Sequence, residues 1–368
     1  MSSIAPGTDA WQPDAVWLRT LRRRMAAWFA KAARDLPWRR TRDPYAIWLS
    51  EVMLQQTQVA TVIPYFERFT KAMPCIAALA AAAEDDVLRL WEGLGYYRRA
   101  RQLHHAAQVI VQRHGGSFPT EFESVRRLPG IGRYTAGAIL SIAFDQRLPI
   151  LEANTLRLGS RLLALQEPPA SAAGQRVLWQ FAELVLPRRG AGRMNQALME
   201  LGATVCLPRA PSCRTCPAAA LCRANQLGMQ EVIPPPRPRP APISVREAAI
   251  VVWRRGKVAI LRQPEGGRWA GLWDFPRFAI HAEHDGRLVR ELVESCRQLS
   301  GLCVDPGERL LVIRHGVTRY RIELQCYDAK LVGTSPRRAD LRWVSPQDLD
   351  AYPLNTTGRK LARHICRV

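Results

Sequence analysis

A proline-rich segment past the middle of the chain limits how the whole sequence can fold. Residues 233–242 read IPPPRPRPAP. Because proline fixes φ and lacks a backbone N–H donor, this segment can form neither a helix nor a sheet strand. We therefore predict a stiff, extended linker over residues 231–243. A chain of 368 residues is also too long for one ordinary core, so we expect the linker to separate two modules.

The residues on the two sides of the linker have different hydrophobic patterns. Over residues 14–205, apolar side chains recur every three or four positions, as in Trp17, Leu21 and Met25, which predicts an all-helical domain. After the linker, short β-branched or alternating runs predict strands at 248–252, 257–262, 310–314 and 320–327, with one helix at about 286–299. The fold class is therefore mainly α, with a smaller α+β domain over residues 244–368.

The balance of charge favours a polyanionic partner. The chain has 53 Lys and Arg against 32 Asp and Glu, a net charge of +21. Nucleic acid is the commonest partner of such a chain, although membrane surfaces and ribosomal RNA attract the same charge. The first residues show no secretory signal, and no apolar run reaches the length of a membrane span. We expect a cytoplasmic protein that binds no membrane.

Four cysteines are clustered directly after the helical region. Cys206, Cys213, Cys216 and Cys222 have the spacing C-x6-C-x2-C-x5-C within the segment 206–230. Thiols stay reduced in the cytoplasm, so the cluster indicates a metal rather than disulfides. Four thiolates in one loop can hold a zinc ion or an iron–sulfur cluster. A zinc site usually has two close cysteine pairs, and this loop has only one.

A glycine-containing turn joins two helical stretches of the first domain. Residues 128–132 read LPGIG, and a helix is predicted to begin at Arg133 and to end at Phe144. Gly130 and Gly132 leave backbone N–H groups bare beside a helix N-terminus, a geometry that binds phosphate. An ordinary helix–helix turn also favours proline and glycine. Both interpretations stay open on these residues alone.

Two carboxylates are candidates for cleaving a glycosidic bond, which requires a proton donor and an anion. Glu51 lies in a helix that Asp43 can cap and that Pro44 can begin. Its helical neighbours are apolar, so its pKa should be raised. Glu152 precedes a second helix, whose N-terminus should favour its ionised form and separate the two pKa values. Each could instead be an ordinary glutamate, solvated or at a helix start.

Residues 50–57, SEVMLQQT, closely resemble the active-site helix of MutY-type adenine DNA glycosylases, members of the helix-hairpin-helix superfamily of endonuclease III. The turn at 128–137 and the cysteine spacing resemble the same family. The resemblance implies a helix-hairpin-helix glycosylase domain with a 4Fe–4S loop, followed by a Nudix-like domain. It also implies a monomer that excises adenine mispaired with 8-oxoguanine or guanine from double-stranded DNA in base excision repair.

The same resemblance implies roles for individual residues. Glu51 would be the general acid and Glu152 the anion, with Asn154 beside it. The adenine pocket and the DNA wedge would include Trp38, Arg39, Gln196, Gln56 and Tyr96. Tyr134 stands where the lyases of the superfamily carry a nucleophilic lysine, so no Schiff base can form there and water should be the nucleophile.

Three departures from the family pattern keep rival interpretations open. Glu152 replaces the usual Asp, and Ala153 replaces the usual Gly. In the segment 315–319, His315 and Thr318 match the family's lesion-reading loop, but its wedging aromatic and second His are missing; a plain turn is the alternative. Residues 290–294, RELVE, resemble a remnant of a Nudix helix, in which Ser295 and Arg297 stand where magnesium-dependent hydrolysis needs a further Glu and a Gly. The rivals are a glycosylase for another mismatched base, such as thymine, and an inert DNA-binding homologue.

Overall fold

The computed structural model describes residues 13–236, 241–282 and 285–367. Residue contacts divide the chain into two units. The first contains Met1–Ala80 and His105–Pro238, and the second contains Ala81–His104 and Arg239–Val368. None of the helices in the described ranges has both the length and the apolar character needed to cross a membrane.

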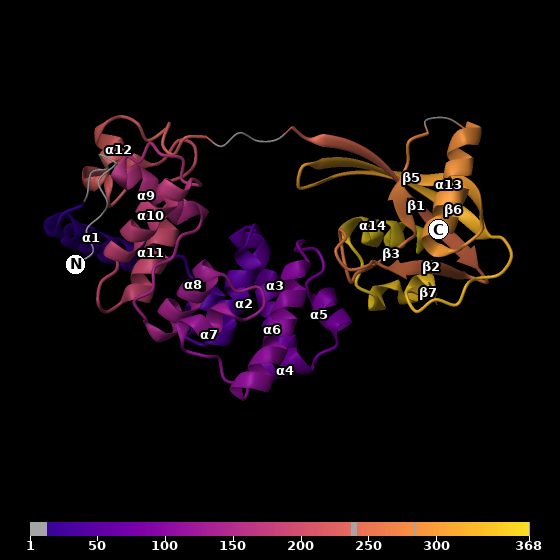
Figure 1. Cartoon of the computed structure of the whole chain (residues 1–368), viewed down its shortest axis with the longest axis horizontal. Helices are drawn as coiled ribbons and strands as arrows, with labels where there is room; N and C mark the ends of the chain where they lie inside the picture. The colour runs from indigo at the N-terminus through magenta and orange to yellow at the C-terminus, as the bar shows by residue number, and fades with distance from the viewer. Residues whose placement is uncertain (1–12, 237–240, 283–284, 368) are drawn as a thin grey trace. The chain divides into compact units, whose positions relative to one another are not determined.

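The first unit is helical, as the spacing of apolar residues predicts (Figure 1). Helix α2 begins at Pro44, directly after Asp43, whose side chain accepts a hydrogen bond from the Tyr45 N–H at 3.0 Å. The helices are α1 (Ala15–Ala32), η1 (Pro37–Arg39), α2 (Pro44–Leu54), α3 (Val59–Ala72), α4 (Ile76–Ala81), α7 (Phe122–Arg126), α8 (Arg133–Phe144), α9 (Ala153–Leu163), α10 (Ala172–Leu184), α11 (Ala191–Thr204), η2 (Cys213–Thr215), η3 (Ala219–Leu221) and α12 (Arg223–Gln226).

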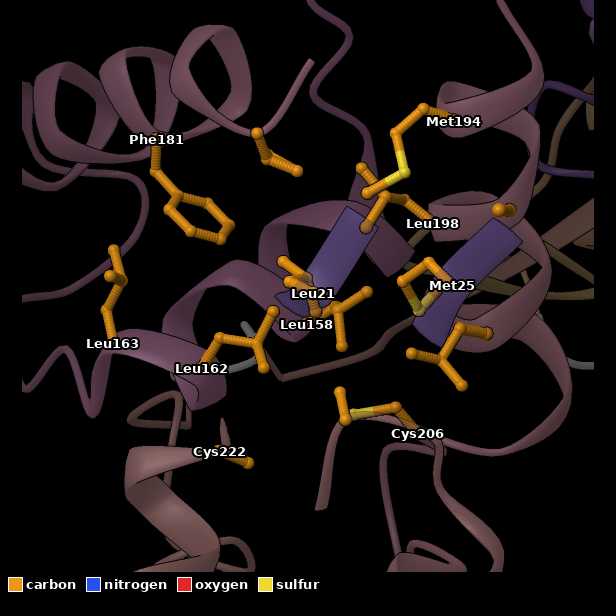
Figure 2. Close-up of a cluster of buried hydrophobic side chains, with 14 of the residues drawn as sticks. Leu21, Met25, Leu158, Leu162, Leu163, Phe181, Met194, Leu198, Cys206 and Cys222 are labelled. Atoms are coloured by element: carbon orange, nitrogen blue, oxygen red, sulfur yellow. The ribbon is translucent and has the colours of Figure 1, made fainter. Parts of the chain in front are cut away.

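A buried apolar core joins the N-terminal helix of this unit to its last helices and to the cysteine-containing loop (Figure 2). The apolar face of α1 supplies Leu21 and Met25, which meet Leu158 of α9 and Leu198 of α11. Two cysteines of the quartet, Cys206 and Cys222, belong to the same cluster. The cysteine loop is therefore continuous with the core that supports α9 and α11.

Two glycines of α11 allow this helix to lie very close to its neighbours. A Cβ atom on Gly192 would collide with the backbone oxygen of Ser141 in α8. One on Gly202 would lie 2.7 Å from the Asn154 Cβ in α9. Asn195 adds a hydrogen bond from its Nδ2 to the Ser141 hydroxyl at 2.9 Å. Because side chains would force the helices apart, these glycines fix α11 against both α8 and α9.

The second unit contains a mixed sheet of seven strands in the order β3-β2-β1-β6-β5, with β4 on β1 and β7 on β2. Strands β1 and β6 pair in parallel, and the other pairs are antiparallel. The four predicted strands and the predicted helix are confirmed. The elements are β1 (Ile243–Arg254), β2 (Lys257–Arg262), β3 (Trp273–Asp274), β4 (Arg277–Ala279), α13 (Asp285–Ser300), β5 (Val304–Val317), β6 (Tyr320–Leu331), β7 (Leu341–Val344), η4 (Pro346–Ala351) and α14 (Thr356–Ile365).

Both faces of this sheet are covered. Alternate residues of a strand point to opposite faces, so Ala249 and Val251 of β1 pack in one cluster with Leu361 of α14. Ile250 of β1 packs in the other cluster with Leu292 of α13. This two-sided core is the α+β domain that the sequence predicts.

The first residues of the predicted linker, 231–243, pack on the first unit. Residues 231–236 form neither helix nor strand, but Ile233 is 2% exposed and belongs to the core of the first unit. Its carbonyl accepts a hydrogen bond from Arg161 Nε at 2.8 Å. Strand β1 begins at Ile243. Burial of Ile233 therefore fixes the start of the proline-rich segment. Residues 1–12 and 237–240 lie outside the described residues.

The grouping of Ala81–His104 with the C-terminal residues is not a feature that local sequence patterns predict. This stretch contains α5 (Glu84–Leu90) and the first part of α6 (Arg98–His114). Arg262 Nη2 contacts Glu84 and Asp85 at 3.2 and 3.3 Å, and Arg359 pairs with Glu92. Long-range ion pairs therefore link α5 and the following loop to the C-terminal residues.

Candidate active site

A cavity of about 590 Å³ in the first unit brings together eight of the residues that the sequence singles out. Its lining comes from η1, α2, the start of α3, α8, α9, α11 and the loops next to them. The sequence-predicted residues in this lining are Trp38, Arg39, Glu51, Gln56, Tyr134, Glu152, Asn154 and Gln196. Segments more than 150 positions apart, from Trp38 to Gln196, therefore meet around one space that is large enough for a small organic group.

Glu51 is a carboxyl group of this cavity whose pKa is strongly raised. It lies on α2 and is 5% exposed. Its Oε2 accepts a hydrogen bond from the Tyr134 hydroxyl on α8 at 2.7 Å. The pKa of Glu51 is raised to about 7, because burial and the nearby Glu152 raise it by more than the hydrogen bond from Tyr134 and the charge of Arg39 lower it. This carboxyl can therefore carry a proton near neutral pH, as its apolar helical neighbours predict.

Tyr134 is a neutral phenol that donates a hydrogen bond to Glu51. Burial raises its phenol pKa well above the usual range, and the neighbouring Glu51 and Glu152 raise it further. The phenol therefore keeps its proton and donates it in the hydrogen bond to Glu51. It contains no amine, so a Schiff base cannot form at this position.

Glu152 is the N-cap residue of α9. Its two carboxylate oxygens accept hydrogen bonds from the backbone N–H groups of Asn154 and Thr155 at 2.8 and 2.9 Å. The Thr155 hydroxyl accepts in turn from the Glu152 N–H at 2.9 Å, which completes a capping box. The longer side chain of glutamate is thus folded back onto the helix start, which fixes the carboxylate in the cavity wall.

The direction of the Glu152 pKa shift differs from the sequence-based expectation. Burial raises the pKa of this carboxyl, while the backbone hydrogen bonds from Asn154 and Thr155 and the charge of Arg157 lower it by less. The helix N-terminus alone therefore does not decide the shift, because desolvation of a buried carboxylate opposes it. Glu152 also raises the pKa of Glu51. The state in which one of these two carboxyl groups is protonated is therefore favoured over the state in which both are ionised.

An ion-pair cluster that sequence patterns did not reveal forms another part of the cavity wall. Glu200 of α11 is fully buried and accepts hydrogen bonds from Arg34 Nε and Arg39 Nη2 at 2.7 and 2.8 Å. Burial raises its pKa, but the hydrogen bonds from Arg34 and Arg39 outweigh burial and lower the pKa to about 2. The spacing of four residues from Gln196 on one helix could have placed Glu200 on the same face.

Asn154 is oriented by a buried arginine that also reaches the cysteine loop. Arg157 Nη2 donates to the Asn154 side-chain oxygen at 2.9 Å and to the Gly202 carbonyl at 2.7 Å. Its Nε donates to the Cys206 carbonyl at 2.8 Å. The cavity wall and the cysteine loop therefore share one hydrogen-bonded side chain.

The four cysteines of the quartet line one small cavity. The described residues contain no group of three or more His, Cys, Asp and Glu side chains already placed to hold a metal ion. Four thiolates are the donor set of a 4Fe–4S cluster. Burial raises the pKa of the Cys216 thiol to about 11, and a cationic group would be needed to hold it as a thiolate. The donor set and its enclosure fit a cluster.

The turn between α7 and α8 exposes both predicted glycines. Gly130 has φ +75°, which favours glycine, and Gly132 is the N-cap residue of α8. A Cβ atom on Gly132 would meet nothing within 4 Å. The space beside this helix N-terminus is therefore open to an external group. The predicted helix Arg133–Phe144 is confirmed.

Three sequence-predicted residues lie in the second unit. Tyr96 follows α5, has φ +49° and is 47% exposed. His315 lies on β5, and its Nε2 is 3.3 Å from Arg277 Nη2. A guanidinium can only donate, so this nitrogen accepts; burial and Arg277 lower the His315 pKa. Thr318 lies in the tight turn between β5 and β6 with φ +52°.

The remnant of the Nudix helix serves the fold of the second unit. The Glu291 carboxylate accepts hydrogen bonds from the His281 and Ala282 N–H groups, the shortest at 2.8 Å. Glu294 pairs with Arg297 on the helix surface at 3.1 Å. Both acids of this motif therefore have partners within the protein.

Comparison with known proteins gives matches along almost the whole chain. Residues 49–183 match the family described as HhH-GPD superfamily base excision DNA repair protein, and residues 248–364 match the NUDIX domain. The adenine DNA glycosylase of Rattus norvegicus is 33% identical, over 95% of this chain and 78% of that protein. The adenine DNA glycosylase of Schizosaccharomyces pombe is 32% identical, over 92% of this chain and 88% of that protein.

Solved structures match the helical part. A thermostable thymine-DNA glycosylase is 27% identical with a TM-score of 0.54, over 58% of this chain and 100% of that chain. A trapped endonuclease III–DNA intermediate has a TM-score of 0.51 at 20% identity, over 59% of this chain and 100% of that chain, which shows a shared fold. Because the adenine-specific relatives match nearly all of the sequence, the chain belongs to the adenine DNA glycosylase family of base excision repair proteins.

Proposed function

We propose that this protein hydrolyses the N-glycosidic bond of adenine mispaired with 8-oxoguanine or guanine in duplex DNA. The observation that carries this proposal is the Glu51 carboxyl, which is buried in the cavity wall with a pKa of about 7 and hydrogen-bonded to Tyr134. A general acid works best when its pKa lies near the operating pH. The cavity of about 590 Å³ suits a nucleotide that has been flipped out of the duplex.

The two carboxylates divide the reaction between them. Glu51 gives its proton to a ring nitrogen of adenine, and the electrons of the glycosidic bond leave with the protonated base. The sugar becomes an oxocarbenium ion, which the Glu152 carboxylate stabilises electrostatically. Water then adds to the anomeric carbon and loses a proton to the ionised Glu51. Tyr134 offers no amine to compete with water, so the enzyme is monofunctional and leaves the strand intact.

The rest of the cavity wall suits recognition of adenine. The Gln196 amide can both donate to and accept from the base edge. Trp38 is held edge-on against Phe66 with ring centroids 5.3 Å apart, so its position in the wall is fixed. Glu200 forms ion pairs with Arg34 and Arg39 beside this space, which offsets the cost of burying its charge.

Several features suit binding of damaged duplex DNA. The net charge of +21 favours phosphate contacts, and the turn at Gly130 and Gly132 opens onto a helix N-terminus. Tyr96 is exposed and can occupy the gap that a flipped base leaves. His315 and Thr318 would read the base opposite adenine. We expect the protein to act as a monomer.

The quartet of Cys206, Cys213, Cys216 and Cys222 would hold a 4Fe–4S cluster. When bound, the cluster supplies cross-links among the four thiolates that fix the loop and contribute to folding. This chain's own residues already tie that loop to the active site: Arg157 contacts the Cys206 carbonyl and the Asn154 side chain. The loop therefore supports the helix start at which Glu152 stands.

Two alternative functions make different predictions. A preference for thymine has the support of the thymine-DNA glycosylase structure at 27% identity, but the adenine-specific relatives match far more of the chain. An inert DNA-binding homologue would follow if Glu152 could not replace the aspartate of the family. Its two hydrogen bonds to the α9 N-terminus argue against that alternative, because they hold the carboxylate in a fixed place.

Base release from defined duplexes tests the proposed function. Under single-turnover conditions we expect release of adenine opposite 8-oxoguanine and opposite guanine, and no release of thymine opposite guanine. Strand breaks should form only after alkali treatment, because no covalent Schiff base forms. Glu51→Gln keeps the shape of the side chain but has no acidic proton, so it should bind the duplexes and release no base. Thymine release would support the first alternative, and binding without any release by the wild type would support the second.

Substitutions of Glu152 test its role as the anion. Glu152→Gln removes the charge and one acceptor of the cap, so we expect a loss of base release of at least about 100-fold, whereas the cap itself is worth only about 1 kcal/mol of stability. Glu152→Asp should be no faster than the wild type. Ser171→Ala is the matched control, because Ser171 caps α10 by accepting from the Gly174 N–H at 3.0 Å. Full activity of Glu152→Gln would reduce Glu152 to a structural cap.

Spectroscopy and metal analysis test the cluster. Protein prepared anaerobically should contain about four iron atoms per chain and absorb light at about 400 nm. Cys213→Ser should lower the iron content and the melting temperature, because loop and metal fold together. Cys303→Ser, which changes an exposed thiol outside the quartet, should change neither. Stoichiometric zinc without iron would contradict the assignment.

A further inference from the structure

The loop that carries Tyr96 is anchored to the C-terminal residues by a bidentate ion pair. Arg359 at the start of α14 donates from Nε to Glu92 Oε1 at 2.6 Å and from Nη2 to Glu92 Oε2 at 2.9 Å. The Leu354 N–H donates to the same Glu92 oxygen at 3.4 Å. Bidentate arginine–carboxylate pairs fix orientation as well as distance. Glu92 is therefore held in one position four residues before Tyr96.

Arg359 is itself a fixed point of the C-terminal fold. It is 7% exposed, and its guanidinium also donates to the Leu349 and Tyr352 carbonyls at 2.9 and 2.7 Å. Asp350 accepts a further hydrogen bond at 2.7 Å. Because four groups of the protein share this guanidinium, it has little freedom to follow movements of Glu92, and the loop must follow Arg359.

The loop transmits this position to Tyr96 through short internal contacts. The Gly93 N–H donates to the Tyr97 hydroxyl at 3.2 Å, and Trp91 Nε1 donates to the Gly95 carbonyl at 3.1 Å. Arg99 Nη2 donates to the same carbonyl at 3.1 Å, and its guanidinium lies 5.5 Å from the Tyr96 ring. Tyr96 has a positive φ, a strained conformation that persists only where the surroundings hold it.

A second attachment prevents α5 and the following loop from rotating about the Glu92–Arg359 ion pair. Arg262 of β2 contacts Glu84 and Asp85 at the first turn of α5, and Trp273 Nε1 donates to Asp85 at 3.4 Å. The α5 helix is therefore attached at its start, and the loop that follows it is attached at Glu92. Two separated attachments fix the direction of the intervening segment.

We propose that Arg359 is a positioning residue for Tyr96: through Glu92 it sets where this exposed aromatic side chain stands, so that the C-terminal domain takes part in opening the duplex. The inference rests on the proposed role of Tyr96 as the DNA wedge. It adds that Tyr96 is fixed to the domain that carries His315, so that the two move together. Breaking the pair should therefore impair base flipping more than it impairs DNA binding.

Base flipping can be measured separately from chemistry. In the Glu51→Gln background, 2-aminopurine replaces the adenine opposite 8-oxoguanine, and its fluorescence rises when the base leaves the stack. Since a misplacement of about 1 Å can cost on the order of 100-fold, we expect Glu92→Gln and Arg359→Gln to lower the equilibrium constant for flipping by about tenfold or more, as Tyr96→Ser does. Arg359→Lys should recover part of the signal, because its ammonium can still pair with Glu92.

Controls separate the possible failures. Arg338→Gln removes a different ion pair of the C-terminal domain, with Asp340 at 2.6 Å, and should flip the base as the wild type does. Glu92→Gln keeps the contacts of Arg359 with Leu349, Asp350 and Tyr352, and its melting temperature reports whether the C-terminal domain stays folded. The double variant should be no worse than either single variant. Normal base flipping by the Tyr96→Ser variant would refute the proposed role of Tyr96 as the DNA wedge. If Tyr96→Ser impairs base flipping but Glu92→Gln and Arg359→Gln flip the base normally, the inference is overturned. Additive losses of flipping in the double variant would overturn it as well.

Discussion

The hydrogen bond from Tyr134 to Glu51 is the interaction on which the active site depends. Burial alone would favour a neutral carboxyl and hold its proton tightly. Tyr134 acts in the opposite direction, because its hydroxyl stabilises the ionised form of Glu51 and lowers its pKa. The result is a carboxyl with a pKa of about 7, which can release its proton to a base and take one back. The same hydrogen bond joins α2 to α8 across the cavity.

The other parts of the first unit hold this pair in place. Gly192 and Gly202 allow α11 to lie against α8 and α9, so that Gln196, Glu200 and the Glu152 cap face one space. The core of α1, α9, α10 and α11 extends to Cys206 and Cys222, and the cysteine loop therefore belongs to the support of α9. In the second unit, the ion pair of Arg359 with Glu92 attaches the Tyr96 loop to the C-terminal fold in a comparable way.

Local patterns predicted what local interactions determine. The cap at Asp43, the start of α8 after Gly132 and the burial of Glu51 all follow from neighbours within one or two helical turns. The cluster around Glu200 depends on Arg34, more than 160 positions away, and could not be read from spacing. The contacts of residues 81–104 with the C-terminal residues likewise include long-range ion pairs. The pKa of Glu152 was expected to fall, but burial within the assembled cavity raises it.

The pH dependence of adenine release at enzyme concentrations below saturation tests the central claim most directly, because it reports the free enzyme. Glu51 must be protonated to act, so the rate should fall as pH rises through about 7. Tyr134→Phe removes a hydrogen bond that lowers the Glu51 pKa, so the midpoint of this fall should move to higher pH. A midpoint that stays in place or moves to lower pH in Tyr134→Phe, or a rate independent of pH across this range, would contradict the account.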